Sequence, residues 1–374
     1  MELQVMRESI DAIDKELIAL FEKRMAIAKT IGNYKRDKNL SIQDAKREID
    51  ITQRAADSVQ PEIKGEAGMF MRQTIALSRL YQQRNLITGD DALLPPPVEP
   101  KQTTAKQKLR IAYSGVKGAW GEAATAKLFP DAEHIGVEHF IDVFEAINGD
   151  CDYGVVPIQN SRTGAIGETY DLLRRYGSYI VKRTQIEIKQ CLLGLKDAEI
   201  RDIREVHSHP EGFSQCERFL SDKSWDLIPC SNTAVAAKKA SESGSKKIAA
   251  IGSRYAAETY GLDIIAPDIM DSNNNRTTFA CIRRVPEYNS GDGFISLTFS
   301  AAHRSGSLCE ALLPFYAAGI NLTRIESRPS STPDSYRFFV EIAGNILDPE
   351  VISTLRQVEA ATAYMEVTGC YSYV

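Results

Sequence analysis

The sequence predicts a multidomain protein with an all-helical domain, then an α/β domain, then a small α+β domain. The apolar pattern carries this prediction: residues 2–86 repeat with a helical period only, whereas strand-like runs alternate with helical stretches from residue 109 onward. The length of 374 residues also allows two or three domains of roughly 150 residues each. We expect these divisions: 1–87, a linker at 88–108, 109–286 and 290–374.

The composition is that of an ordinary globular protein, with 43% hydrophobic and 25% charged residues. A net charge of −5 gives no overall attraction to nucleic acid. No apolar run reaches the roughly 18 residues that span a membrane, and the N-terminus lacks the apolar core of a signal peptide. The 7 cysteines form no CxxC and the histidines show no zinc-like spacing. We therefore expect a reduced, cytoplasmic protein without a metal site.

The helical domain is predicted to begin with one helix of about ten turns. Its apolar residues recur at helical spacings: Leu3, Met6, Ile10, Ile13, Leu17, Leu20, Ile27 and Ile31. Ser41–Asp44 resembles a capping box, so a second helix should begin there and end at Pro61. A third helix is predicted from about Met69, after Gly65 and Gly68, to Leu86.

Basic and hydrogen-bonding side chains gather in this domain. Arg24 and Lys35 lie within about 20° of one helix face. Arg7 precedes Arg24 by about 26 Å along the axis, so one small metabolite cannot contact both from one helix. Either Arg7 has no role, or it reaches a site in a partner chain whose helix runs antiparallel. The remaining members are Asp44, Arg47, Glu48, Ser78 and Gln82.

This set contains no nucleophile and no obvious base. It suits a unimolecular reaction of a dianion, accelerated by conformational restraint and electrostatic complementarity. The alternative interpretation is the charged solvent face of a helical dimerisation module.

In order and spacing, the eight residues resemble the site of the all-helical chorismate mutases. The resemblance implies an intertwined homodimer in which Arg24 and the partner's Arg7 hold the carboxylates of chorismate. It implies that Lys35 and Gln82 face the ether oxygen, and that Lys35, Gln82 and Glu48 are catalytic. The others would order the substrate hydroxyl or border a carboxylate: Asp44 and Arg47 with Glu48 at the hydroxyl, and Ser78 at the carboxylate.

Residues 88–108 are rich in proline, threonine and lysine and show no periodicity. They predict an extended, semi-rigid linker with little core.

The α/β domain is predicted from alternating strands and helices, which favours a mostly parallel sheet. The expected strands are Leu109–Tyr113, Tyr153–Ile158, Ile180–Ile188, Asp226–Pro229, Ile248–Gly252 and Thr278–Ile282. The expected helices are Glu122–Phe129, Gly167–Tyr176, Glu211–Ser221, Thr233–Ser243 and Ser253–Tyr260.

Segments rich in hydrogen-bond donors stand at the ends of these elements. Gly115–Gly121 follows the first strand, and Gln159–Ile166 follows a buried strand. Ser208–Pro210 and Ser231–Thr233 each precede a helix. Each one alone predicts a tight turn, a solvated loop or an N-cap. Together they predict a cleft lined by helix N-termini that attract anions.

These segments, together with Arg276–Phe279, resemble prephenate dehydratase. The resemblance implies two α/β subdomains around a cleft, as in the periplasmic binding proteins. It makes Thr277 the catalytic hydrogen-bond donor to the leaving hydroxyl, and aromatisation of the ring means that no metal or cofactor is needed. The residues that would bind prephenate are Gln159, Asn160, Ser161, Thr163, Gly164, Thr233 and Arg276.

Two positions depart from that family. Gln159 stands where the family usually has glutamate, and Thr278 stands where it usually has arginine. We hypothesise that Arg276, two residues earlier and on the same side of an extended segment, supplies the missing charge. The departures keep open a second function, in which the later domains bind prephenate or phenylalanine without turnover and regulate the mutase. A transporter-like binding lobe is a further alternative, which the lack of a signal peptide disfavours.

The last domain is predicted in the order βαββαβ, which gives an antiparallel sheet with helices on one face. The expected strands are Phe294–Ala301, Ile320–Ser327, Tyr336–Ala343 and Ala363–Thr368, and the expected helices are Gly306–Ala318 and Pro349–Glu359. Two motifs lie in it: Gly306, Ser307, Leu308 and Cys309, and then Glu326, Ser327, Arg328 and Pro329. They shape turns only, or they form a ligand site.

The motifs resemble those of the ACT domain fused to prephenate dehydratases, which implies a phenylalanine site between paired subunits. Apart from the linker, the whole chain resembles the bifunctional chorismate mutase–prephenate dehydratases, which combine an isomerase and a lyase in phenylalanine biosynthesis. The resemblance implies conversion of chorismate to prephenate and then to phenylpyruvate, with restraint by L-phenylalanine, in a homodimer or tetramer.

Overall fold

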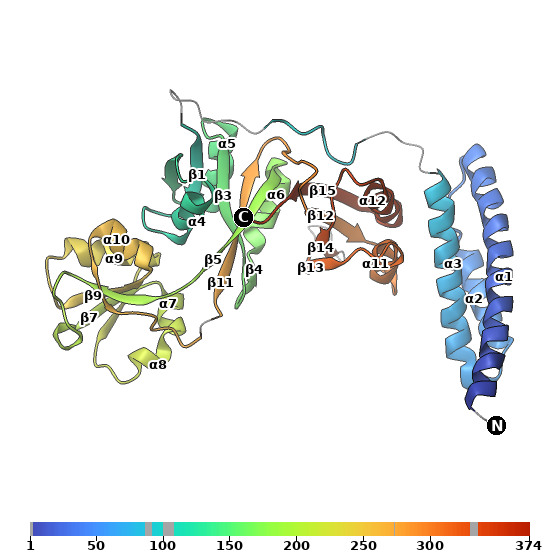
Figure 1. Ribbon diagram of the computed structural model, residues 1–374, viewed down its shortest axis with the longest axis horizontal. Helices are drawn as coiled ribbons and strands as arrows, with labels where there is room; N and C mark the ends of the chain where they lie inside the picture. The colour runs from blue at the N-terminus through green and yellow to red at the C-terminus, as the bar shows by residue number, and fades with distance from the viewer. Residues whose placement is uncertain (1–2, 87–91, 100–107, 273, 330–335) are drawn as a thin grey trace.

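The computed structural model describes residues 3–86, 92–99, 108–272, 274–329 and 336–374. Figure 1 shows a helical module, a two-lobed module and a C-terminal module. The C-terminal module lies between the other two, since its helix α12 contacts α3 and its strand β15 contacts β5. The order in space therefore differs from the order in sequence.

The helical module contains the three predicted helices: α1 (Leu3–Asp37), α2 (Ala45–Asp57) and α3 (Lys64–Leu86). Asp44 caps α2, because its carboxylate accepts a hydrogen bond from the Arg47 amide at 3.1 Å. Two predicted limits are wrong: α2 ends before Pro61, which begins a 3-10 turn (Pro61–Ile63), and α3 begins before Met69. Gly65 and Gly68 lie inside α3, where packing outweighs a cost of about 1 kcal/mol per glycine.

Lobe 1 of the two-lobed module is a sheet with the order β2-β1-β3-β11-β5, and the short β4 pairs with β3. Its strands are β1 (Arg110–Ser114), β2 (Glu133–Val137), β3 (Tyr153–Asn160), β4 (Gly164–Ala165), β5 (Tyr179–Glu187) and β11 (Arg276–Arg283). Its helices are α4 (Trp120–Leu128), α5 (Phe140–Asn148) and α6 (Gly167–Tyr176).

Lobe 2 is a second sheet with the order β10-β6-β9-β7-β8. Its strands are β6 (Cys191–Gly194), β7 (Glu205–Ser208), β8 (Asp226–Pro229), β9 (Ile248–Gly252) and β10 (Asp263–Ala266). Its helices are α7 (Pro210–Gln215), α8 (Glu217–Leu220), α9 (Thr233–Glu242) and α10 (Arg254–Tyr260), with a 3-10 turn at Ile200–Asp202.

The expectation of a mostly parallel sheet is wrong, because both sheets are mixed. β11 pairs antiparallel with both β3 and β5, and β6 pairs antiparallel with β9 and β10. The reason is the path of the chain, which leaves lobe 1 after β5 and returns through β11 from the opposite direction. The sequence prediction also missed β2, β4, β6, β7, β10 and α5, and it merged α7 and α8.

Mixed pairing still gathers the polar segments. β1 and β3 run parallel, so their carboxyl ends meet at one edge of the sheet, and the antiparallel β11 begins at that same edge. In lobe 2 the parallel β7 and β9 likewise end at one edge, from which α7 and α10 start. These edges are where ligands bind in open α/β sheets.

The C-terminal module has the predicted βαββαβ order: β12 (Phe294–Ala301), α11 (Ser307–Ala317), β13 (Leu322–Pro329), β14 (Tyr336–Ala343), α12 (Pro349–Ala361) and β15 (Tyr364–Tyr371). Its antiparallel sheet has the order β13-β14-β12-β15, so β13 is an edge strand. Figure 1 shows α11 and α12 on the face of this sheet toward the helical module.

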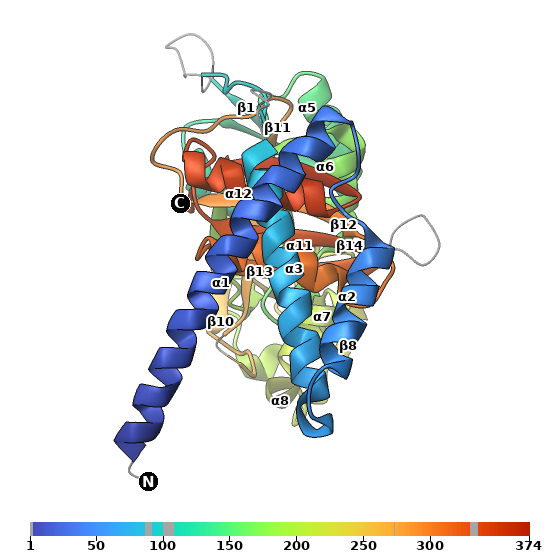
Figure 2. The ribbon, with the colours of Figure 1, turned by 90° about the vertical axis from the view of Figure 1, so that its right-hand side faces the viewer.

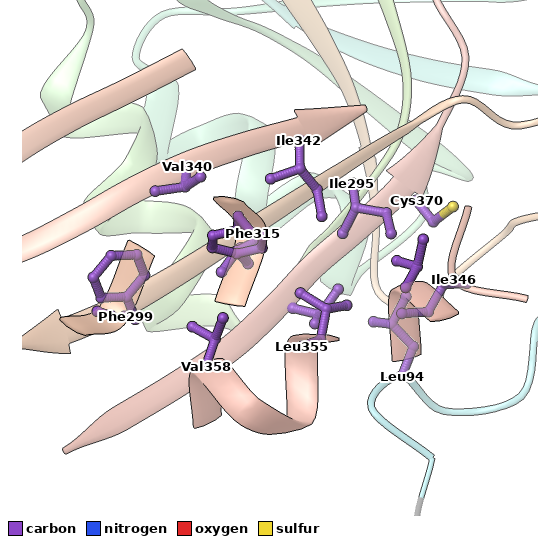
Figure 3. Close-up of a cluster of buried hydrophobic side chains, with 14 residues drawn as sticks. Leu94, Ile295, Phe299, Phe315, Val340, Ile342, Ile346, Leu355, Val358 and Cys370 are labelled. Atoms are coloured by element: carbon purple, nitrogen blue, oxygen red, sulfur yellow. The ribbon is translucent and has the colours of Figure 1, made fainter. Parts of the chain in front are cut away.

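Part of the predicted linker belongs to a core. Leu94 is only 2% exposed and packs with Ile346, Leu355 and Cys370 of the C-terminal module, as Figure 3 shows. The Val98 amide also donates to the Pro286 carbonyl at 3.0 Å. The expectation of little core is therefore wrong for residues 92–99. Residues 88–91 and 100–107 lie outside the described residues.

Candidate functional site

The helical module brings Arg24, Ser78 and Gln82 to the packed interface of α1 and α3. Arg24 donates to the Thr74 carbonyl at 3.1 Å, and burial lowers the pKa of Arg24. A Cβ at Gly32 would lie 3.1 Å from the Gln82 Cγ, so the glycine allows the close approach of the two helices. The Gln82 amide oxygen is buried and has no hydrogen-bond partner among the described residues. A buried polar atom of this kind needs a ligand or a partner chain to satisfy it.

Further polar groups lie at the end of α1 and in α2. The Lys35 ammonium donates to the Ile42 carbonyl at 2.5 Å and so closes the turn between α1 and α2. Glu48 pairs with Arg79 at 2.8 Å, a residue that the sequence analysis missed. Burial raises the pKa of Glu48, although the Arg79 charge acts in the opposite direction. Spacing along the sequence gives no signal for this pair, since its members come from different helices.

Arg7 does not join this group within one chain. Figure 2 shows the first half of α1, which carries Arg7, extending beyond α2 and α3. Each of the eight apolar residues of the predicted stripe on α1 is at least 43% exposed. A continuous apolar stripe of this length indicates a surface for association.

In lobe 1 the structure pairs Asn160 with Thr277 across β3 and β11. The Asn160 amide nitrogen donates to the Thr277 hydroxyl at 3.0 Å and to the Asn275 side-chain oxygen at 2.8 Å. The Asn160 oxygen accepts from the amides of Arg162 and Thr163. Because the Thr277 oxygen accepts a hydrogen bond, its own proton is free to be donated, and the first bond strengthens the second.

Asn275 is fully buried and was missed as a member of this group. Its place in a polar run just before a strand was the available signal, but a run of this kind most often forms a solvated loop. The Ser161 hydroxyl donates to the Asn274 carbonyl at 2.9 Å and accepts from the Arg276 amide at 3.0 Å. These bonds tie the loop after β3 to the start of β11.

Gln159 and Arg276, two of the residues expected to bind prephenate, lie on the opposite face of the sheet from Thr277. Gln159 pairs with Thr278, next to the Asn160–Thr277 pair. Because successive residues of a strand point to opposite faces, Gln159, Thr278 and Arg276 lie on the face away from Thr277. Thr278 is buried there and accepts a hydrogen bond from the Gln185 amide at 3.4 Å.

Thr233 lies across the cleft at the start of α9, where the Asn232 side chain accepts from the Val235 amide at 2.8 Å. A cavity of about 960 Å³ lies between the lobes beside it. Gly115–Lys117 lines the cavity from lobe 1, and Ser231 and Asn232 line it from lobe 2. Thr163 ends the turn before β4, and Gly164, the first residue of β4, has a left-handed φ of 83°.

The two motifs of the C-terminal module lie on different elements, the start of α11 and the edge strand β13. Gly306 takes a left-handed φ of 82° before α11, and Ser307 and Leu308 line a hollow of about 410 Å³. The second motif (Glu326–Pro329) runs along the edge strand β13, which β14 separates from β12. The Arg328 guanidinium packs against Gly167, leaving no room for a side chain there, and pairs with Asp171 of α6 at 3.5 Å. The second motif thus reaches the helix that follows the Asn160 loop.

No helix in the described ranges has both the length and the apolar character needed to cross a bilayer. Within the same ranges, no three His, Cys, Asp or Glu side chains cluster as a metal site would require.

Comparison with known families identifies all three modules. The family model of type II chorismate mutase matches residues 6–83, that of prephenate dehydratase matches residues 111–287, and that of the ACT domain matches residues 295–360. The three matches follow one another in the order that the resemblance predicts.

Relatives of the full length are also found. The chain is 30% identical to a bifunctional chorismate mutase/prephenate dehydratase of Escherichia coli over 99% of this chain and 96% of the relative. It is 32% identical to the Aquifex aeolicus enzyme of that description over 99% and 98%. A solved structure of prephenate dehydratase in complex with L-Phe, from Arthrobacter aurescens, superposes with a TM-score of 0.64. It has 27% identity and covers 71% of this chain and 90% of that one.

Proposed function

The chain belongs to the family of bifunctional chorismate mutase/prephenate dehydratases, and from this premise we propose which residues carry its two reactions. It is an enzyme of phenylalanine biosynthesis with an isomerase module and a lyase module. It rearranges chorismate to prephenate, and then removes CO₂ and the ring hydroxyl of prephenate to give phenylpyruvate.

For the mutase we propose that the buried Gln82 amide and the Lys35 ammonium face the ether oxygen of chorismate. The unpaired polar atom of Gln82 supports this, since an amide turned by 180° presents its NH₂ group to a ligand. Negative charge grows on that oxygen as the C–O bond breaks, so fixed donors there stabilise the transition state. Arg24 holds one carboxylate, Ser78 borders it, and Asp44, Arg47 and Glu48 order the substrate hydroxyl.

The exposed stripe on α1 supports a dimer in which two long helices cover each other. In that dimer the partner's Arg7 holds the second carboxylate of chorismate. Whether two dimers join as a tetramer stays an open prediction, and so does the cytoplasmic location.

For the dehydratase we propose that Thr277 donates its proton toward the leaving hydroxyl of prephenate. The single observation that carries this role is the hydrogen bond from Asn160, which fixes the threonine oxygen as an acceptor and directs its proton elsewhere. Hydroxide is a poor leaving group, so a donor at this oxygen lowers the barrier. Ser161, Thr163 and Gly164 place the loop beside it, and Thr233 presents a helix start from lobe 2.

The two departures from the family are neighbours in space. Gln159 and Thr278 are opposite each other on paired strands, so a glutamate and an arginine at these positions would form a cross-strand pair. Here both charges are absent together, which leaves neither one unpaired and supports an active enzyme over a sensing module. We keep the proposal that Arg276 supplies positive charge at this edge, and unchanged prephenate turnover in Arg276→Ala would refute it.

The effector proposal uses both subunits. Gly306, Ser307, Leu308 and Cys309 of one chain meet Glu326, Ser327, Arg328 and Pro329 of the other, and together they bind L-phenylalanine. No described strand pairs with the outer edge of β13, which carries the second motif, so this edge is available to a partner chain and supports the arrangement. L-Phe is also the ligand of the similar Arthrobacter aurescens structure.

Reciprocal variants test the two sites in one protein. Thr277→Val removes only the hydroxyl and should lower dehydratase kcat by roughly 10²- to 10⁴-fold while the mutase is unchanged. Gln82→Met should lower mutase kcat by roughly 10²-fold or more while the dehydratase is unchanged. Thr278→Val is the matched control, since Thr278 is uncharged, buried and bonded to Gln185 instead of the Asn160–Thr277 pair, and it should retain near wild-type turnover.

The assay follows loss of chorismate and appearance of phenylpyruvate from added prephenate. A wild-type protein that binds prephenate without forming phenylpyruvate would establish the sensing module in place of the dehydratase. Equal losses in Thr277→Val and Thr278→Val would overturn the assignment of Thr277.

A further inference from the structure

The glycine loop, defined here as residues 115–118, is held firmly by lobe 1. The Gly115 amide donates to the Val137 carbonyl of β2 at 2.7 Å, and the Gly118 amide donates to the Glu122 carboxylate at 2.6 Å. Glu122 is only 6% exposed, so the bond to Gly118 is formed away from water. Hydrogen bonds to a charged group out of water are among the stronger ones in proteins.

The same loop is also held by lobe 2. The Tyr260 hydroxyl of α10 donates to the Lys117 carbonyl at 2.5 Å. A Cβ at Gly118 would lie 3.0 Å from the Tyr260 ring and 3.4 Å from the Ala256 Cα, so α10 packs directly on the loop backbone. Gly118 has a φ of +84°, which a side chain disfavours as well. The contact therefore depends on a glycine in the loop and a tyrosine across the cleft.

The hydroxyls at this contact stay protonated at neutral pH. Burial raises the pKa of Tyr260, and the Glu122 charge raises it further. Burial and the same carboxylate raise the pKa of the neighbouring Tyr255 to about 12. The Tyr260 hydroxyl therefore keeps its proton at neutral pH and can donate it to the Lys117 carbonyl.

The contact between Tyr260 and the glycine loop lies next to the cleft between the lobes. Residues 115–117 of the glycine loop line the cavity of about 960 Å³ from one side, and Ser231 and Asn232 line it from the other. Tyr260 binds Lys117, which lines this cavity, although Tyr260 itself does not. A separation of α10 from the loop would therefore move lobe 2, with Thr233 at the start of α9, away from lobe 1. Prephenate carries two carboxylates, and it gains most from donors on both lobes when they are held close.

We propose that Tyr260 is a positioning residue of the dehydratase, which holds lobe 2 against the glycine loop and so keeps the cleft closed before prephenate binds. This inference rests on the proposed site in the two-lobed module. A protein that is closed for only a fraction of the time binds its ligand more weakly by that fraction. Once prephenate is bound to both lobes, the substrate itself holds them together. Loss of Tyr260 should therefore affect KM more than kcat.

Tyr260→Phe removes one hydroxyl and leaves the ring in place. We expect the KM for prephenate to rise about 3- to 10-fold, the range that one net hydrogen bond supports. We expect kcat to stay within about twofold, and mutase kinetics in the same preparation to be unchanged. Retained mutase activity and an unchanged thermal midpoint report that the variant is folded.

Tyr176→Phe is the matched control. Its hydroxyl donates to Glu145 at 3.2 Å and joins α6 to α5 within lobe 1. The chemical change is identical, but no contact between the lobes is lost, so the KM for prephenate should not change.

Gly118→Ala tests the other side of the contact. The added Cβ separates the loop from Tyr260, so we expect a larger rise in KM than Tyr260→Phe gives. The double variant should resemble Gly118→Ala alone, because both changes break one contact and cannot add.

Three results would overturn the proposal: equal KM shifts in Tyr260→Phe and Tyr176→Phe, a fall in kcat with unchanged KM, or additive effects of Gly118→Ala and Tyr260→Phe. Each of these leaves the dehydratase assignment intact, which fails only if the wild-type protein does not form phenylpyruvate.

Discussion

The C-terminal ACT domain joins the dehydratase and the mutase through two very different contacts. Its contact with the dehydratase is buried and continuous. Arg183 of β5, only 1% exposed, pairs with Glu341 of β14, and it donates to the Ser296 hydroxyl at 3.0 Å. The guanidinium also lies 4.8 Å from the centre of the Tyr371 ring. A charge this deeply buried is stable only when an opposite charge and hydrogen bonds compensate it. Glu341 and Ser296 do this for the terminal nitrogens of Arg183, while its Nε has no partner among the described residues.

The backbone continues the same connection. The Val374 amide donates to the Arg183 carbonyl at 2.8 Å, and the Arg183 amide donates to the Ser372 carbonyl at 3.1 Å. The end of the chain thus extends the sheet beside β5, and β5 pairs directly with β11, which carries Thr277. The ACT domain is therefore part of the structure that positions β11, which carries the proposed dehydratase residue Thr277.

The contact with the mutase contains partly exposed ion pairs. Arg79 of α3 lies between Glu48 of the proposed mutase site at 2.8 Å and Glu310 of α11 at 3.2 Å. Glu310 also pairs with Arg304 at 2.5 Å, just before the first effector motif. A cleft of about 270 Å³ beside Arg79 separates the two domains. Such a contact can open without exposing a core. The difference predicts that an effector acts on the dehydratase through packed strands and on the mutase through a few charges.

The largest effect should come from the buried pair. Arg183→Met leaves Glu341 charged and unpaired, so it should lower the free energy of unfolding by roughly 3–5 kcal/mol. Denaturant titration followed by circular dichroism measures this loss, together with the loss of dehydratase activity. Because the dehydratase and ACT cores are joined, both should unfold in one transition.

The double variant Arg183→Met, Glu341→Leu is the control for charge. It removes both charges together and should recover most of the lost stability, since apolar replacement of a buried pair is often neutral. A loss below about 1 kcal/mol in Arg183→Met alone would contradict a tightly joined contact.

The sequence was sufficient for elements with a long or repeated pattern. The stripe on α1 and the βαββαβ order were predictable, because each rests on a periodicity that packing does not change. The direction of β11 was not predictable, since it depends on the path of the chain between the lobes. Leu94 was not predictable either, because an apolar residue in a proline-rich run has no period.

The same limit applies to the sites. Resemblance gave Asn160 and Thr277, but it did not give the hydrogen bond between them, which needs the register of β3 against β11. Nor did it show that Gln159 and Thr278 are cross-strand neighbours. Arg79 was missed because its two partners are distant in sequence and lie in different domains.

A smaller effect is expected at the mutase contact. Glu310→Gln removes the ACT charge that holds Arg79, while the effector motifs and the Arg183 contact remain. If phenylalanine binding changes mutase activity through the Arg79–Glu310 ion pair, that change in activity should become about 2- to 5-fold smaller, the range expected for a partly exposed ion pair. Inhibition of the dehydratase by phenylalanine should persist in the same variant, which shows that the effector still binds.

Glu359→Gln is the matched control, because Glu359 pairs with Arg356 inside the ACT domain at 2.8 Å. Parallel loss of both phenylalanine responses in Glu310→Gln would mean that the change damages the effector site, and it would contradict a separate route to the mutase.

The smallest effect is electrostatic and appears in the pH profile of the mutase. Burial raises the pKa of Glu48 above the ordinary value of 4.5, the nearby Glu310 charge adds to this, and Arg79 opposes it. If Glu48 acts as a carboxylate, mutase kcat/KM should fall as the pH drops through a pKa above 4.5. Glu310→Gln removes a negative charge near Glu48 and leaves Arg79 paired with Glu48 alone. Both changes lower the pKa of Glu48, so the acid limb of the mutase pH profile should move to lower pH.

The pKa of Glu310 itself is lowered by Arg304 and Arg79 despite its burial. The interaction that it contributes to the domain contact is therefore present above its ordinary pKa and is lost as the pH falls through the lowered value. As the pH falls, Glu48 is protonated first, because its pKa is raised, and the mutase contact weakens only at lower pH, where Glu310 is protonated. The buried Arg183 contact has no such dependence on Glu310. Profiles of kcat/KM for both reactions, measured on wild type, Glu310→Gln and Glu359→Gln, separate these contributions. Two results would show that charge does not distinguish the two contacts. In Glu310→Gln, the acid limb of the mutase profile would move to higher pH, or the dehydratase profile would shift together with it.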